Sequence, residues 1–223
     1  MRLFALRFAP VLVALPLSTE VHAAASLLVD DAGTTPAAEC QLESWLSHHT
    51  GHRQATLVPA CALGNTEWSL GISRLSHGQG MPWALGAKRT VVGQEGDRLR
   101  VAISADAGND ARSGNAANWG LTVPLSLRLD AAGRLLLHAN LGWRVEHDAR
   151  YLTSGIGMEL PLLARWSLLA EGARDAAGSH AVQIGGRREL GAAGATLDVL
   201  AGRRFGDAGE RWLTVGLNLP LSR

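Results

Sequence analysis

The chain has 223 residues, which is enough for one large domain or two small ones. Its 21 Lys and Arg residues balance 20 Asp and Glu residues, which argues against a nucleic-acid binder, a class that usually carries a basic excess. Beyond the N-terminus no run of about 18 apolar residues occurs, so the sequence predicts no transmembrane helix there.

The first 23 residues have the pattern of a signal peptide. Arg2 and Arg7 supply positive charge, and residues 8–17 (FAPVLVALPL) form an apolar segment of about the usual 7–15 residues. Small residues follow, so we predict cleavage after Ala23, with Ala25 as the alternative, and export of the chain. A short buried helix is the other interpretation, but two prolines within the segment oppose it.

Two cysteines, Cys40 and Cys61, follow residues 24–38, a short leader rich in small and turn residues. An exported chain with an even number of cysteines suggests a disulfide. If residues 40–47 and 53–62 pair as a hairpin, the two cysteines lie directly opposite each other. The sequence therefore predicts a Cys40–Cys61 bridge between neighbouring strands, and two buried free thiols are the alternative.

From residue 39 onward the chain divides into about twelve alternating segments bounded by turn signals. If the segments are counted along the chain, the connection after every second segment is tight, and the connections between these turns tend to be longer and more polar. An outer-membrane barrel alternates in this way between short periplasmic turns and longer outer loops. We therefore predict one all-β domain over residues 39–223, an antiparallel transmembrane β-barrel of about 12 strands. The predicted segments are 39–47, 53–62, 65–74, 82–92, 98–106, 118–129, 134–146, 152–161, 165–173, 180–189, 195–204 and 212–220.

Residues 134–146, RLLLHANLGWRVE, illustrate the two faces of these segments. Apolar side chains take every second position from Leu135 onward, with His138, Asn140 and Arg144 among the residues between them. Across the segments the polar face is rich in Gly, Ser, Ala, Asn and Thr and poor in Lys and Glu. This composition suits a crowded polar lumen, with the apolar face in lipid. A soluble secreted β-protein is the alternative.

Tryptophan placement also favours a membrane. Five of the seven Trp residues lie near segment ends on the apolar face, which is typical of aromatic girdles. Two Trp residues on the polar face and a proline inside a strand, which cannot donate to the ladder, depart from this pattern. The five girdle residues are Trp68, Trp83, Trp119, Trp143 and Trp166; the three departures are Trp45, Trp212 and Pro124.

Thirteen polar side chains are predicted to face the lumen. They could line a hydrated pore and set its selectivity. They could instead pair with one another and fill the interior, because twelve strands lie between filled eight-stranded barrels and open porins of 16–18 strands. Of these roles we favour the paired network. The candidates are Glu67, Lys88, Arg100, Asp106, Arg128, His138, Asn140, Arg144, Glu159, Glu171, Arg187, Asp198 and Arg204.

The stretch SHHTGH contains three histidines, His48, His49 and His52. They could offer two or three imidazoles to a metal ion or make the loop pH-responsive. No carboxylate or cysteine lies within the loop, so we expect an ordinary solvated loop, with no metal and no cofactor.

Catalytic motifs are absent from the sequence, which contains no GxSxG, P-loop or HExxH pattern. His138 could approach Ser126 or Ser154 on a neighbouring strand, as a lipase-like site would require. Nothing else supports such a site, so we expect no enzymatic activity.

Three stretches resemble a family of outer-membrane β-barrel transporters labelled after a phenol-degradation operon. They are residues 137–146 (LHANLGWRVE), 154–174 (SGIGMELPLLARWSLLAEGAR) and 182–206 (VQIGGRRELGAAGATLDVLAGRRFG). The resemblance implies passage of small compounds, hydrophobic or aromatic ones among them, and supplies no catalytic or binding residues. The cysteine hairpin departs from the family, and the chain ends in LSR where many barrels end in an aromatic residue.

These observations predict a barrel in the cell outer membrane that allows passive passage of small solutes. Its expected partners are outer-membrane lipid and a small-molecule solute, with no nucleic acid. A non-conducting barrel that braces the envelope or binds a partner is the alternative function.

Overall fold

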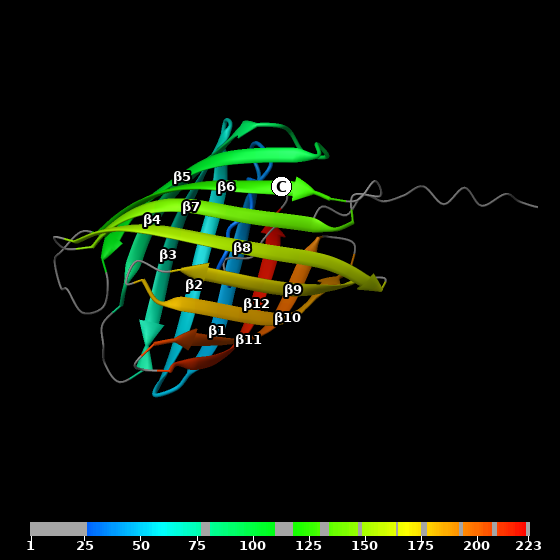
Figure 1. Cartoon of the computed structure of the whole chain (residues 1–223). Helices are drawn as coiled ribbons and strands as arrows, with labels where there is room; N and C mark the ends of the chain where they lie inside the picture. The colour runs from blue at the N-terminus through cyan, green and yellow to red at the C-terminus, as the bar shows by residue number, and fades with distance from the viewer. Residues whose placement is uncertain are drawn as a thin grey trace, which may run out of the picture.

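A computed structural model describes residues 26–76, 81–109, 118–129, 134–146, 149–163, 165–174, 178–191, 194–206 and 209–221. Within these ranges twelve antiparallel strands close into a barrel in which β1 pairs with β12 and every other pair is consecutive in the chain. Figure 1 shows β1, in blue, close to β12, in red. Among the described residues, no helix is long and apolar enough to cross a membrane. The predicted signal peptide, residues 1–23, lies outside the described residues.

Each strand begins and ends within three residues of its predicted segment, which confirms the predicted antiparallel barrel. Alternation of apolar and polar side chains, rather than intrinsic strand preference alone, defines these strands because the two faces meet different surroundings. The strands are β1 (Cys40–His49), β2 (His52–Leu63), β3 (Thr66–Leu75), β4 (Trp83–Val92), β5 (Leu99–Asn109), β6 (Asn118–Arg128), β7 (Leu136–Glu146), β8 (Ala149–Leu163), β9 (Trp166–Arg174), β10 (His180–Leu190), β11 (Ala195–Phe205) and β12 (Arg211–Leu221).

The two ends of the barrel differ in their connections. We call the end with the tight connections the turn end, and the end with the connections that follow β1, β3, β5, β7, β9 and β11 the loop end. Strand β1 starts at the turn end, where Cys40 pairs with Leu221 of β12 and with Cys61 of β2. Cys40 and Cys61 form a disulfide, so both the predicted bridge and the predicted hairpin register are confirmed.

The outer face of the barrel is apolar. Leu141, Ile156 and Ile184, near the middle of β7, β8 and β10, have more than half of their surface exposed. The five predicted girdle tryptophans are also exposed, at 43–54%. Three of them lie towards the loop end and two towards the turn end. Such a band of apolar side chains between two aromatic rings is the exterior of a transmembrane barrel.

Two prolines inside strands coincide with gaps in the ladders. The paired positions of β5 and β6 skip from Val101 to Ser104, opposite Pro124. Those of β2 and β3 skip from Leu57 to Ala60, next to Pro59. Proline has no backbone N–H to donate, and each of these prolines lies where one neighbouring strand is not paired with it.

A charge at the centre of the apolar band tests the face assignment. Replacing Leu141 with Arg is expected to cost about 2–4 kcal/mol, because Leu141 faces lipid at mid-strand, where a charge is most expensive. The matched change Leu63→Arg, at the turn-end rim of β2, should cost only about 0–1 kcal/mol. Reversible guanidinium unfolding in lipid vesicles, followed by tryptophan fluorescence, measures both. Equal costs for the two variants would contradict a membrane-spanning band.

Candidate functional site

The interior of the barrel is crowded with polar side chains. On β10 and β11, Gln183, Arg187 and Asp198 point inward and are less than 5% exposed. Leu200 and Trp212 also point inward, and the indole of Trp212 packs on the backbone of Gly202. The lumen is therefore partly filled by the side chains of its own wall.

Residues 26–35, which we call the plug segment, cross this lumen. The backbone amide of Thr35 donates to Glu67 of β3, and the Ser26 hydroxyl donates to Asp198 of β11. Between these contacts Val29 is 1% exposed and Ala32 is fully buried. These residues belong to the short leader predicted from the sequence, for which no role is predicted, but in the structure they lie inside the barrel.

Wall side chains satisfy the backbone of the plug segment. Glu171 of β9 accepts hydrogen bonds from the amides of Leu28 and Val29, at 3.0 and 3.2 Å. The Asn140 amide group of β7 makes two bonds of 2.7 Å with Asp30, accepting from its N–H and donating to its carbonyl. Buried backbone groups require such partners, so these two side chains hold one defined conformation of the segment.

The rest of the plug segment is held from the other side of the barrel. The Ser126 hydroxyl of β6 accepts a 2.8 Å bond from the amide of Ala32, and Thr90 of β4 donates a bond of the same length to the Ala32 carbonyl. Glu67 accepts from both the amide and the hydroxyl of Thr35, each at 2.6 Å. Contacts from β3, β4, β6, β7 and β9 thus surround the segment.

Ion pairs add to these hydrogen bonds. Lys88 of β4 has its ammonium 2.7 Å from an Asp30 carboxylate oxygen and 3.7 Å from one of Asp31. The Lys88 side chain is 12% exposed and that of Asp31 only 4%. The guanidinium of Arg100 also lies against the segment, beside Gly33. The two acidic residues of the plug segment therefore face basic side chains of the wall.

A second cluster fills the lumen towards the turn end. Arg187 of β10 donates two bonds of 2.8 Å to the two oxygens of Asp198, and a third bond of 3.1 Å to Glu159 of β8. All three side chains are at most 4% exposed. The bidentate geometry makes this a strong charge-assisted pair, and the cluster joins the inward faces of β8, β10 and β11.

A cavity of about 690 Å³ lies against the plug segment and extends from the loop-end halves of the strands towards the turn end along β1, β2 and β3. Asp30 and Asp31 contribute to its lining, together with Glu146, Arg174 and Arg204 from the loop-end halves of the strands. The wall also carries the half-exposed ion pair between Arg144 and Asp106, 3.1 Å apart. The cavity is thus a polar vestibule with charges of both signs.

The structure brings the predicted lumen candidates into several separate groups. Five of them, Glu67, Lys88, Arg100, Asn140 and Glu171, contact the plug segment as described. His138 shares a 2.9 Å hydrogen bond with Ser126, and Arg128 lies on the same inward face of β6 as Ser126. Arg204 forms an ion pair with Glu210 at the loop end.

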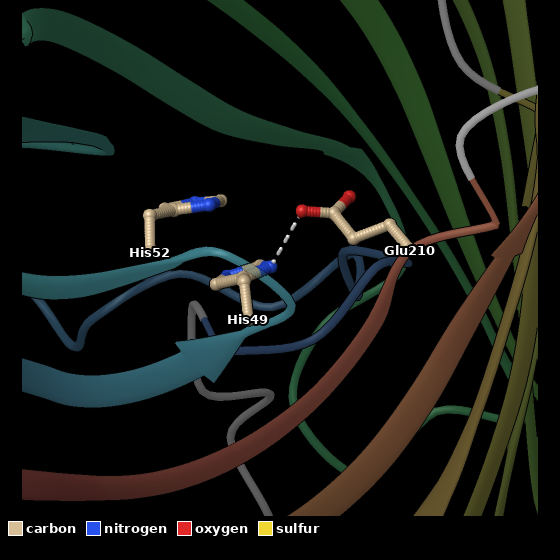
Figure 2. A group of neighbouring side chains, drawn as sticks. All are labelled: His49, His52 and Glu210. Atoms are coloured by element: carbon tan, nitrogen blue, oxygen red, sulfur yellow. Dashed lines mark hydrogen bonds and ion pairs between the residues drawn. The ribbon is translucent and has the colours of Figure 1, made fainter.

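At the loop end His49 and His52 meet across the β1–β2 hairpin, and Glu210 joins them from the start of β12 (Figure 2). His48, the third histidine of this loop, is exposed and takes the opposite face of β1. Sequence reasoning missed Glu210 because it lies 161 residues from His49 and becomes its neighbour only when the barrel closes.

Sequence reasoning also missed the plug segment, although one signal pointed to it. Gly155 and Gly157 take the inward face of β8, and side chains there would meet Val29 at 2.8 and 3.3 Å. Inward glycines leave the space that another piece of backbone occupies.

A family comparison identifies the chain. The model of the family described as uncharacterised conserved protein UCP029691 matches residues 11–221. The chain belongs to that family. That description carries no link to phenol degradation, so this part of the resemblance drawn from the sequence stays a prediction. Among curated proteins, no match is found.

Solved structures with similar folds are outer-membrane porins and channels. The KdgM porin, solved in complex with disordered oligogalacturonate, aligns with a TM-score of 0.66 at 8% identity, over 80% of this chain and 98% of that one. The NanC porin aligns at 0.59 and 10% identity with the same coverage. The COG4313 outer membrane channel from Pseudomonas putida F1 aligns at 0.58 and 12% identity, over 86% and 98%. All three are described as porins or channels, and the prediction of a non-enzymatic chain agrees with them.

Proposed function

We propose that this protein is an outer-membrane channel for small polar solutes whose lumen is closed, in the conformation described above, by its own N-terminal plug segment. The apolar exterior with two aromatic rings supports a place in the membrane. The buried crossing of residues 26–35 is the observation that carries the closure. Opening then requires the segment to move, and solute passes by diffusion.

The lining of the vestibule favours a polar solute. Acidic and basic side chains face the cavity together, including Asp106, Arg144, Arg174 and Arg204. A hydrophobic or aromatic compound, as the resemblance drawn from the sequence suggests, would desolvate these charges without replacing their water. A sugar or sugar acid could replace that water with hydroxyl and carboxylate groups, and the similar KdgM porin was solved with an oligogalacturonate.

A reversible covalent lock tests whether the plug segment is the gate. A Cβ atom built on Gly157 lies 3.3 Å from the Cβ of Val29, close to the spacing of about 3.5–4.5 Å found in disulfides. The double variant V29C/G157C should therefore tie the segment to β8 when oxidised. In liposome-swelling assays with small sugars, we expect oxidation to abolish permeation and dithiothreitol to restore it.

Two controls accompany the lock. The single variant G157C lacks the partner thiol and should behave alike in both redox states, and the wild type with dithiothreitol reports any effect of reducing Cys40–Cys61. Equal permeation by the oxidised and reduced double variant would contradict gating by the segment. A folded wild type that admits no solute in either state would contradict the channel itself.

A further inference from the structure

Three potential metal ligands meet at the loop-end mouth of the lumen. His49 ends β1, His52 begins β2, and Glu210 comes directly before β12. His49 and Glu210 share the inward side of their strands with the buried residues Ser47 and Trp212. The three side chains are half-buried and therefore accessible to a small ion from the loop end.

The geometry is close to that of a three-ligand site. One nitrogen of each imidazole and one carboxylate oxygen all lie within 4.8 Å of one another. The Nδ1 atom of His49 is 3.0 Å from Oε1 of Glu210, and the two imidazole rings stack with centroids 4.4 Å apart. A tetrahedral zinc ion with bonds of about 2.0–2.2 Å holds its ligands roughly 3.3–3.6 Å apart. The two imidazole rings would have to turn out of their parallel stack, with the ligand atoms moving by about 1 Å, to complete that arrangement.

The surroundings of the cluster orient its side chains. Arg204 places its Nε atom 3.3 Å from Oε2 of Glu210, so one carboxylate oxygen is ion-paired with the guanidinium while Oε1 faces the histidines. The indole of Trp212 lies 5.9 Å from the His49 ring and limits how far that ring can turn away. Such outer contacts orient the ligands of protein metal sites.

We propose that His49, His52 and Glu210 bind one divalent transition-metal ion such as Zn²⁺, Cu²⁺ or Ni²⁺. Two imidazoles and one carboxylate suit these borderline ions, whereas Ca²⁺ and Mg²⁺ prefer oxygen ligands alone. The ion would tie the β1–β2 hairpin to the start of β12, across the seam where the barrel closes. The disulfide staples β1 to β2 at the turn end, so β1 would be fastened at both ends. This inference depends neither on conduction nor on the plug segment.

Metal titration of the full-length folded protein tests the site. Untagged protein in detergent is stripped with a chelator and titrated with Zn²⁺ by calorimetry. We expect one equivalent to bind, and we expect H52A and E210Q each to weaken binding by about 10-fold or more. H48A is the matched control because His48 belongs to the same loop but faces outward, and it should bind like the wild type.

Electron paramagnetic resonance of the Cu²⁺-loaded protein supplies a second measurement. The wild type should show couplings from two nitrogens, and H52A from one. Heat-modifiable gel migration verifies that each variant is folded. Absence of stoichiometric binding by the folded wild type would overturn the proposal, as would a loss of affinity in H48A equal to that in H52A.

Discussion

A chain that begins at Pro36, and so lacks the plug segment, is expected to conduct in steady steps in a planar bilayer, whereas the full chain stays closed most of the time. The segment fills the lumen between β3 and β11 and makes its hydrogen bonds to wall side chains. Without it, water replaces those contacts along a lined interior. We expect the mean current to rise on the order of tenfold.

The shortened chain should still fold, because every strand keeps both of its neighbours in the closed ladder. Heat-modifiable migration checks this before any recording. A synthetic peptide of residues 26–35, added from the turn end, should then block the current in a dose-dependent way, and a scrambled peptide should not. A folded but silent shortened chain would contradict the closure mechanism and would leave the wall cluster around Arg187 as the obstruction.

The barrel itself could be predicted because each of its determinants is local. Apolar and polar side chains must alternate along a strand that lies between lipid and a polar lumen. The adjacent residues Leu141 and Asn140 therefore indicate which face of β7 is outward and which is inward. The register of the first hairpin follows from its turn, which places Cys40 opposite Cys61. Alternation, turns and tryptophan placement therefore carry enough information for the number of strands and their inward faces.

The plug segment and the mouth cluster could not be predicted in this way. Residues 26–35 have no periodicity that reveals a face, because their hydrogen-bond partners are single side chains on distant strands. Glu210 meets His49 only through the pairing of β12 with β1. Contacts across a lumen depend on the curvature of the closed sheet, which the alternation of a strand does not encode.

Replacing Arg187 with Met is expected to destabilise the barrel by about 3–5 kcal/mol. The change keeps an apolar stem of similar length but removes the guanidinium that compensates two carboxylates, those of Asp198 and Glu159, which are 1% and 4% exposed. Their desolvation is then no longer offset by bidentate and charge-assisted hydrogen bonds. Guanidinium unfolding in lipid vesicles at fixed pH and salt measures the loss.

The matched variant Arg144→Met removes the same group from a hydrated pair. Arg144 and Asp106 are 34% and 29% exposed and face the vestibule, so water can solvate the remaining carboxylate, and the expected cost is about 0–1 kcal/mol. A triple variant, R187M with D198N and E159Q, should recover part of the stability lost in R187M, because it removes the uncompensated charges. Similar costs for Arg187→Met and Arg144→Met would mean that water reaches both sites equally, and the turn-end half of the lumen would then be open rather than filled.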